Sequence, residues 1–146
     1  MTDLEIRPAG PADFEAAKDL LQAAGLPVED LSGDQLGHFL VASIGGAVAG
    51  VIGLEAFSGI GLLRSLVTRA DVRNAGIGRR LVAALEVRAR RQGLQELWLL
   101  TIDAGHFFEK LGYRVRQRDE APDAIQRTAE FSTLCPADAV LMSKPI

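Results

Sequence analysis

The residues with the clearest chemical meaning are the glycines in the stretch Arg73-Asn74-Ala75-Gly76-Ile77-Gly78-Arg79. Glycine lets main-chain N–H groups approach a phosphate closely, because no side chain stands in the way. The amphipathic segment 77–92 that follows predicts a helix, and the N-terminus of a helix carries the positive end of its dipole. The stretch therefore predicts a binding site for a phosphate-bearing ligand. Arg79 and Arg80 either add positive charge to that site or form a solvated helix face, and the sequence leaves both open.

A second group of reactive side chains lies just upstream. Arg64 and Ser65 stand in the apolar segment 62–68, and Glu55 ends the apolar segment before it. An arginine inside an apolar strand is expensive unless it is paired. Two interpretations follow: a structural ion pair between Arg64 and Glu55, or Arg64 as the anchor for a substrate carboxylate. Glu55 is also a candidate general base.

The composition limits the partners. The 146 residues include 16 Lys and Arg against 19 Asp and Glu, a net charge of −3, which argues against nucleic-acid binding. One cysteine excludes an internal disulfide, and His38 and His106 come without carboxylates at metal-binding spacing, so no metal is expected. No apolar stretch approaches membrane-spanning length and no signal peptide is recognisable. We expect a single cytoplasmic domain over residues 1–146, away from the membrane.

The periodicity of apolar residues predicts the elements that position these groups. Strands are expected at 4–7, 39–42, 48–54, 62–68, 96–101, 113–117 and 139–142, and helices at 11–24, 77–92, 104–111 and 122–128. Gly45-Gly46 predicts a hairpin. The second helix is expected to point Glu86 outward with the arginines, and its inward face is made of Ile77, Leu81, Ala84, Leu85 and Ala89. A run of strands followed by strand–helix–strand units predicts a mixed sheet with helices on both faces.

Two motifs together resemble those of the GCN5-related N-acetyltransferase (GNAT) superfamily. Arg73, Gly76 and Gly78 fill its Arg-x-x-Gly-x-Gly pattern, and the stretch 107–113, Phe-Phe-Glu-Lys-Leu-Gly-Tyr, is similar to its second feature. The resemblance covers essentially the whole chain and implies an α/β (α+β) fold with a mixed, mostly antiparallel central sheet. Stretches 24–27, 62–66, 130–136 and 142–144 are most similar to members described as arsenic-resistance N-acetyltransferases.

The resemblance implies the ligands. Acetyl-CoA would be the cosubstrate, and its acetyl group would pass to the primary amine of a small, anionic, amino-acid-like substrate, for which Arg64 is the candidate binding residue. A homodimer is compatible with the resemblance. The residues that the family pattern assigns to CoA, the first three through pairing with the pantetheine arm, are Leu66, Val67, Thr68, Arg73, Asn74, Ala75, Gly76, Ile77, Gly78 and Arg79.

The chain departs from the family at its acid–base residues. The usual tyrosine acid is replaced by Phe108, the glutamate of some members by Leu62, and the usual asparagine by Thr101. The catalytic residues therefore stay unknown, with Glu55, Ser65 and Tyr113 as candidates; Tyr113 is more readily read as a packing aromatic. The departures leave an alternative open, a non-catalytic acyl-CoA-binding or sensor module of the same fold.

Overall fold

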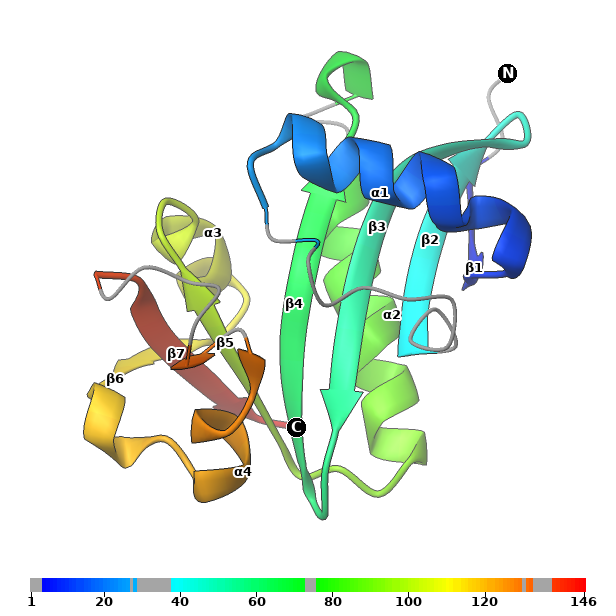
Figure 1. The fold of residues 1–146 in the computed structure, drawn as a ribbon. Helices are drawn as coiled ribbons and strands as arrows, with labels where there is room; N and C mark the ends of the chain where they lie inside the picture. The colour runs from blue at the N-terminus through cyan, green and yellow to red at the C-terminus, as the bar shows by residue number, and fades with distance from the viewer. Residues whose placement is uncertain (1–3, 27, 29–37, 73–75, 130, 133–137) are drawn as a thin grey trace. The chain divides into compact units, whose positions relative to one another are not determined.

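The computed structural model describes residues 4–26, 28, 38–72, 76–129, 131–132 and 138–146. Among these residues lie the short 3-10 helices η1 (Pro11–Asp13), η3 (Ala70–Val72) and η4 (Arg118–Glu120). The strands and α-helices follow the predicted order (Figure 1): β1 (Leu4–Pro8), α1 (Phe14–Ala23), β2 (Phe39–Ile44), β3 (Ala47–Ala56), β4 (Ile60–Thr68), α2 (Ile77–Arg91), β5 (Glu96–Thr101), α3 (Gly105–Lys110), β6 (Arg114–Arg116), α4 (Asp123–Gln126) and β7 (Val140–Pro145).

The strands form one seven-stranded sheet in the order β1-β2-β3-β4-β5-β7-β6. β1 pairs antiparallel with β2, β2 with β3, β5 with β7 and β6 with β7, whereas β4 pairs parallel with β5. The predicted mixed, mostly antiparallel sheet is therefore confirmed. The chain divides into two compact units: unit 1 is Met1–Leu54 with Ser65–Val87, and unit 2 is Glu55–Arg64 with Arg88–Ile146.

In unit 1, helices cover both faces of the strands (Figure 1). Gly45 and Gly46 both have positive φ and close the predicted hairpin between β2 and β3. α2 lies against the face that carries Gly50, where Ile77 and Leu81 approach the strand. α1 packs on the other face, in a buried cluster of Ala17, Leu21, Phe39, Val41, Val51 and Val67.

The start of α1 is tied to β1 by an ion pair. Both oxygens of the buried Asp13 carboxylate accept from Arg7, at 2.7 and 3.0 Å, and Oδ2 also accepts from the Gly10 N–H at 2.7 Å. The hydrogen bond from Arg7 is the main reason that the pKa of Asp13 lies below its usual range. Residues 11–13, predicted to open the helix, instead form the separate η1 turn that presents this carboxylate.

In unit 2, one face of β5 and β7 carries its own apolar cluster. Leu62, Trp98, Ala121, Ile125 and Leu141 are buried there, so α4 lies on this face. The opposite face carries Lys144, whose ammonium lies over the Tyr113 ring next to α3. α3 and α4 are both shorter than predicted.

One prediction about α2 is wrong. Glu86 was expected to point outward, yet it is buried, with 7% of its surface exposed. Val82 stands one helical turn before Glu86 and is buried too, so α2 buries a wider arc than the predicted stripe of Ile77, Leu81, Ala84, Leu85 and Ala89. Within the described ranges, no helix has the length and apolarity needed to cross a bilayer.

Candidate functional site

The glycine turn leads directly into α2. Arg73, Asn74 and Ala75 lie outside the described residues, but Gly76 has a φ of +80° and precedes the first helical residue, Ile77. A Cβ on Gly76 would meet nothing within 4 Å, so the glycine is required by its left-handed backbone. Its carbonyl accepts the N–H of Arg80 at 3.1 Å. The first N–H groups of a helix have no partner within it, so residues 76–79 can present N–H groups to an anion.

Gly50 on β3 fixes how closely α2 approaches the strands. A Cβ there would lie 3.0 Å from Leu81 Cδ1, 3.2 Å from the Val67 carbonyl oxygen and 3.3 Å from Ile77 Cγ2. Only a residue without a side chain allows this approach. Gly50, which the sequence analysis did not single out, therefore lies next to both Val67 and Ile77, two of the residues assigned to CoA. Gly50 could have been identified from the sequence as a glycine inside an apolar strand.

The C-terminal half of β4 contains a backbone irregularity. Ser65 has a φ of +60°, in the left-handed region, and is buried. A non-glycine residue in this region is strained, which is typical of bulges and functional sites. The three predicted CoA-binding residues follow it, with Val67 buried against α1 and Leu66 and Thr68 half-buried. The Arg69 N–H then donates to the Ala49 carbonyl at 2.7 Å. These residues belong to unit 1, as does the start of α2.

Arg64 and Glu55 form the ion pair that was one of the two sequence interpretations. Arg64 Nη1 donates to Glu55 Oε2 at 3.1 Å. The arginine side chain is 2% exposed and the glutamate side chain 29% exposed. The surface therefore presents the carboxylate of the pair, with the guanidinium beneath it. Both residues belong to unit 2.

The aromatic residues of the second motif pack on one another. The Phe108 ring meets the rings of Phe107 and Tyr113 edge-on, with centroids 5.1 and 5.5 Å away. Tyr113 is 2% exposed and Phe108 is 4% exposed. The Lys144 ammonium lies 5.4 Å from the centroid of the Tyr113 ring. This geometry favours the packing interpretation of Tyr113 over the catalytic one.

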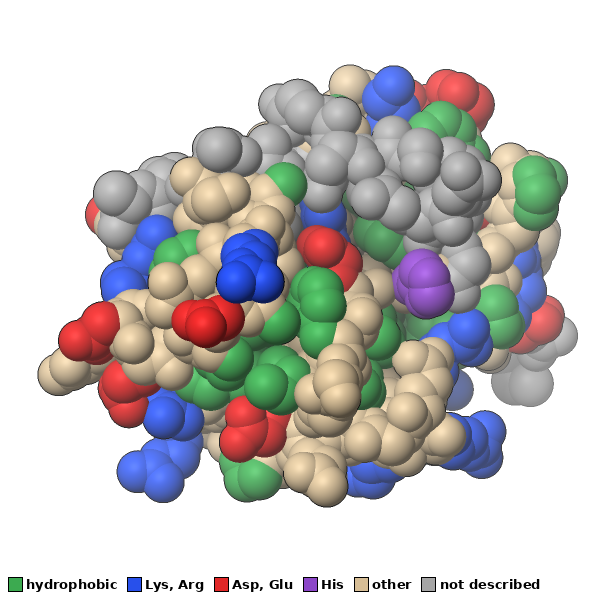
Figure 2. Space-filling view, turned by 60° about the horizontal axis from the view of Figure 1, so that its bottom comes forward, with side chains coloured by type: hydrophobic (Ala, Val, Ile, Leu, Met, Phe, Trp, Pro, Cys, Tyr) green, Lys and Arg blue, Asp and Glu red, His purple; other side chains and the backbone are tan. Residues whose placement is uncertain are grey.

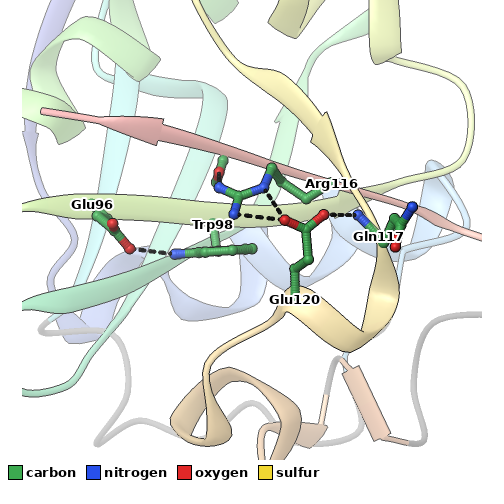
Figure 3. Close-up of polar contacts among 6 residues, drawn as sticks. Glu96, Trp98, Arg116, Gln117 and Glu120 are labelled. Atoms are coloured by element: carbon green, nitrogen blue, oxygen red, sulfur yellow. Dashed lines mark hydrogen bonds and ion pairs between the residues drawn. The ribbon is translucent and has the colours of Figure 1, made fainter.

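An arginine joins the strands of unit 2 to the segment after β6 (Figure 3). The Arg116 guanidinium lies over the Trp98 ring, 4.9 Å from its centroid. It donates to Ser143 Oγ at 2.9 Å and to Glu120 Oε2 at 3.0 Å. The Glu120 carboxylate also accepts the Gln117 N–H, which lowers its pKa, and Arg116 lowers it further. At the edge of the ring, the Trp98 indole N–H donates to Glu96 at 3.0 Å.

The remaining candidates have structural roles or lie outside the described residues. Thr101 Oγ1 accepts the Ala104 N–H at 3.0 Å and so begins α3. His106 is almost fully exposed, 3.9 Å from Glu109, and His38 is also exposed. Cys135 is not among the described residues. Among those that are, no group of His, Cys, Asp and Glu is arranged to hold a metal ion.

The sequence matches a family model described as an acetyltransferase (GNAT) domain over residues 35–115. It is 33% identical to an uncharacterized N-acetyltransferase of Chlorobaculum tepidum over 118 residues, which covers 77% of this chain and 74% of that protein. It is also 38% identical to the amino-acid acetyltransferase of Ectopseudomonas mendocina over 67 residues, which covers 46% of this chain but 16% of that much longer protein.

The fold is similar to that of a solved structure. N-acetylglutamate synthase from Neisseria gonorrhoeae, in complex with coenzyme A and N-acetyl-glutamate, superposes with a TM-score of 0.86 at 20% identity. The similarity covers 98% of this chain and 35% of the synthase, so the chain spans about a third of that protein.

Proposed function

The chain belongs to the GNAT acetyltransferase family and is by that membership an acetyl-CoA-dependent N-acetyltransferase, and we propose that its acceptor is the primary amine of a small, amino-acid-like substrate. The observation that carries this proposal is the pairing of the family match with similarity to amino-acid acetyltransferases. The solved synthase of similar fold holds CoA and an N-acetylated amino acid.

The proposed CoA site is made largely of main chain. The pyrophosphate would rest on N–H groups of residues 73–79, where the left-handed Gly76 and the start of α2 support it. The pantetheine arm would pair with Leu66, Val67 and Thr68 as an added strand. Support comes from Gly50, which brings Val67 and Ile77 together without an intervening side chain. Arg79 is exposed in the first turn of α2, where it can meet phosphate charge.

The proposed chemistry is direct transfer. The neutral amine attacks the thioester carbonyl carbon, and the CoA thiolate leaves as the amide forms. N–H groups of β4 next to the strained Ser65 would stabilise the oxyanion. Glu55 is our candidate to take the proton of the amine, because its carboxylate is the exposed member of the ion pair with Arg64.

Neither Phe108 nor Tyr113 is our candidate for the general acid that would protonate the CoA thiolate. Phe108 has no proton to donate, and the Tyr113 side chain is buried in the aromatic cluster. A thiol has a pKa of about 8.5, so a thiolate is a tolerable leaving group that water can protonate. We therefore assign no protein residue to the acid.

The Arg64–Glu55 pair bears on the charge of the substrate. Arg64 is fully buried under Glu55, so it would act on a substrate carboxylate as a buried positive charge unless Glu55 moves aside. Amino acids and their phosphinic or arsonic analogues combine an amine with such an anion. The arsenic-containing analogues, suggested by the sequence resemblance, belong in the same proposal.

A thiol-release assay tests the proposal. Acetyl-CoA would be offered with a panel of amino acids and phosphinic or arsonic analogues, and CoA binding would be followed in parallel by calorimetry. Release that depends on one of these amines is the expected result. Tight CoA binding without release from any amine would contradict it and favour the non-catalytic acyl-CoA-binding alternative.

A further inference from the structure

The face of unit 2 next to the Arg64–Glu55 pair is apolar but incompletely covered. Four half-buried hydrophobic side chains pack around its buried cluster: Phe57, Ile60, Leu100 and Phe131. They come from the β3–β4 turn, from the start of β4, from β5 and from the segment after α4. The face drawn in Figure 2 likewise presents hydrophobic side chains beside acidic and basic ones. A ligand that covers half-buried apolar side chains removes apolar surface from water, which makes the binding free energy more favourable.

Alternation along β4 assigns Arg64 to the face that carries this cluster. β4 and β5 run parallel, with Ile60 opposite Glu96 and Leu62 opposite Trp98. Two residues further along each strand are Arg64 and Leu100, which alternation assigns to the same face as Leu62 and Trp98. Leu62 and Trp98 do share one cluster, with Leu100 and Phe131 packed against it.

Phe131 is held in place by its own neighbours. The Arg118 guanidinium lies over its ring, 4.6 Å from the centroid, and also donates to the Ala139 carbonyl at 3.1 Å. The Phe131 N–H donates to Thr128 Oγ1 at 3.2 Å. A fixed, half-buried aromatic ring is the kind of surface that contributes binding free energy without a large ordering cost.

We infer that Leu100 and Phe131 form the acceptor-specificity surface, and that the acceptor is an amine with an unbranched or weakly branched apolar side chain. The inference rests on the proposed function. The amine would meet the exposed carboxylate of Glu55, which has its other side against Arg64.

The test is a series of amino-acid substrates whose side chains grow by one methylene at a time. Acetyl-CoA consumption would be measured with alanine, 2-aminobutyrate, norvaline and norleucine, and with glutamate as the charged counterpart. We expect kcat/KM to rise about fourfold for each methylene that reaches the surface. Glutamate should be a poorer substrate than norvaline, because its second carboxylate would lose water against apolar side chains.

Two variants locate the surface, and a third controls for fold. Leu100→Ala and Phe131→Leu should flatten the series to less than about twofold per methylene. Ile102→Ala, at a side chain 65% exposed just after β5, should keep the wild-type slope.

The outcomes separate this inference from the proposed function. A wild-type series that is flat, or that favours glutamate, would overturn the inference and leave the N-acetyltransferase proposal standing; so would slopes that neither variant changes. The wild-type series decides even if a variant fails to fold. No release from any amine, in the series or the wider panel, would overturn the proposed function and this inference together.

Discussion

The proposed CoA region and the proposed acceptor region differ in which part of the chain forms them. The CoA region in unit 1 is made of main chain: a left-handed glycine, the N-terminus of α2 and the end of β4, brought together at Gly50. The acceptor region in unit 2 is made of side chains: a buried arginine, its half-exposed glutamate partner, and apolar residues from several elements. A main-chain site is dictated by backbone conformation, whereas a side-chain site is dictated by which residues the fold brings together.

The difference predicts how each region responds to substitution. Every residue except proline has a main-chain N–H group, so the CoA region should be sensitive to residues that reshape the backbone or block access to it. The acceptor region should be sensitive to single side-chain charges and volumes. Backbone-directed substitutions in the CoA region and side-chain substitutions in the acceptor region, each with a matched control, therefore test this difference.

The largest effect is expected from Gly76→Glu. The new side chain would strain the left-handed backbone and place bulk and negative charge where the pyrophosphate is proposed to bind. CoA affinity should fall about a thousandfold, or about 4 kcal/mol, by calorimetry. Gly93→Glu is the matched control, because Gly93 follows the other end of α2 with a φ of +84° and equally open space. Equal losses in the two variants would mean that backbone strain, not the site, is responsible.

The next largest effect should come from Glu55→Gln in the side-chain region. The amide cannot take a proton from the amine, so kcat/KM should fall about a hundredfold. CoA affinity should stay the same. Glu96→Gln removes a half-exposed carboxylate that also accepts one side-chain hydrogen bond, from Trp98, and should have little effect on kcat/KM. Equal activity of the Glu55 variant and wild type would remove Glu55 from the mechanism.

Two glycines on β3 sharpen the comparison within unit 1. A Cβ on Gly53 would lie 2.6 Å from the Phe39 ring, whereas one on Gly50 would press on Leu81, Ile77 and the Val67 carbonyl. Alanine at either position should lower the free energy of unfolding by about 1–3 kcal/mol, measured in denaturant. Only Gly50→Ala should also weaken CoA binding, by several-fold. If Gly53→Ala weakened it as much, general destabilisation would explain both.

The smallest effect concerns pH and stability. Arg7 holds the pKa of Asp13 below its usual range, so the ionised carboxylate stabilises the folded state. This stabilisation is present above the unfolded-state pKa of about 3.9 and is lost as pH falls through the lower folded-state value. The wild type should therefore lose stability in that acidic window, and Asp13→Asn should lose about 1 kcal/mol near neutrality and show a flatter profile. Parallel profiles of the two proteins would contradict this account.

The contrast between main-chain and side-chain sites also explains which features could be predicted from the sequence. The order of elements, the Gly45-Gly46 hairpin and the helix that begins after Gly76 were predictable, because each depends on local backbone preferences. The family resemblance was predictable for the same reason, since its motifs describe a turn and a helix start. Gly50 was missed because its importance depends on α2, which follows much later in the chain.

Side-chain environments were harder to predict. Glu86 was misplaced, because a helical wheel gives one inward stripe and cannot say how wide an arc the neighbouring strands cover. The sequence offered the Arg64–Glu55 pair as one of two interpretations, and the contact needed the fold to appear. Leu100 and Phe131 carry no motif at all, and the fold alone brings both against the cluster around Leu62 and Trp98.

The most direct test of the main-chain site is to titrate isotopically labelled protein with CoA and follow each backbone amide by NMR. The account predicts that the largest shifts occur at the amides of residues 73–79 and of Leu66, Val67 and Thr68, and that Gly76→Glu abolishes them. Large shifts confined to other amides, with residues 73–79 unmoved at saturation, would contradict the central claim that the glycine turn and the start of α2 hold the cofactor.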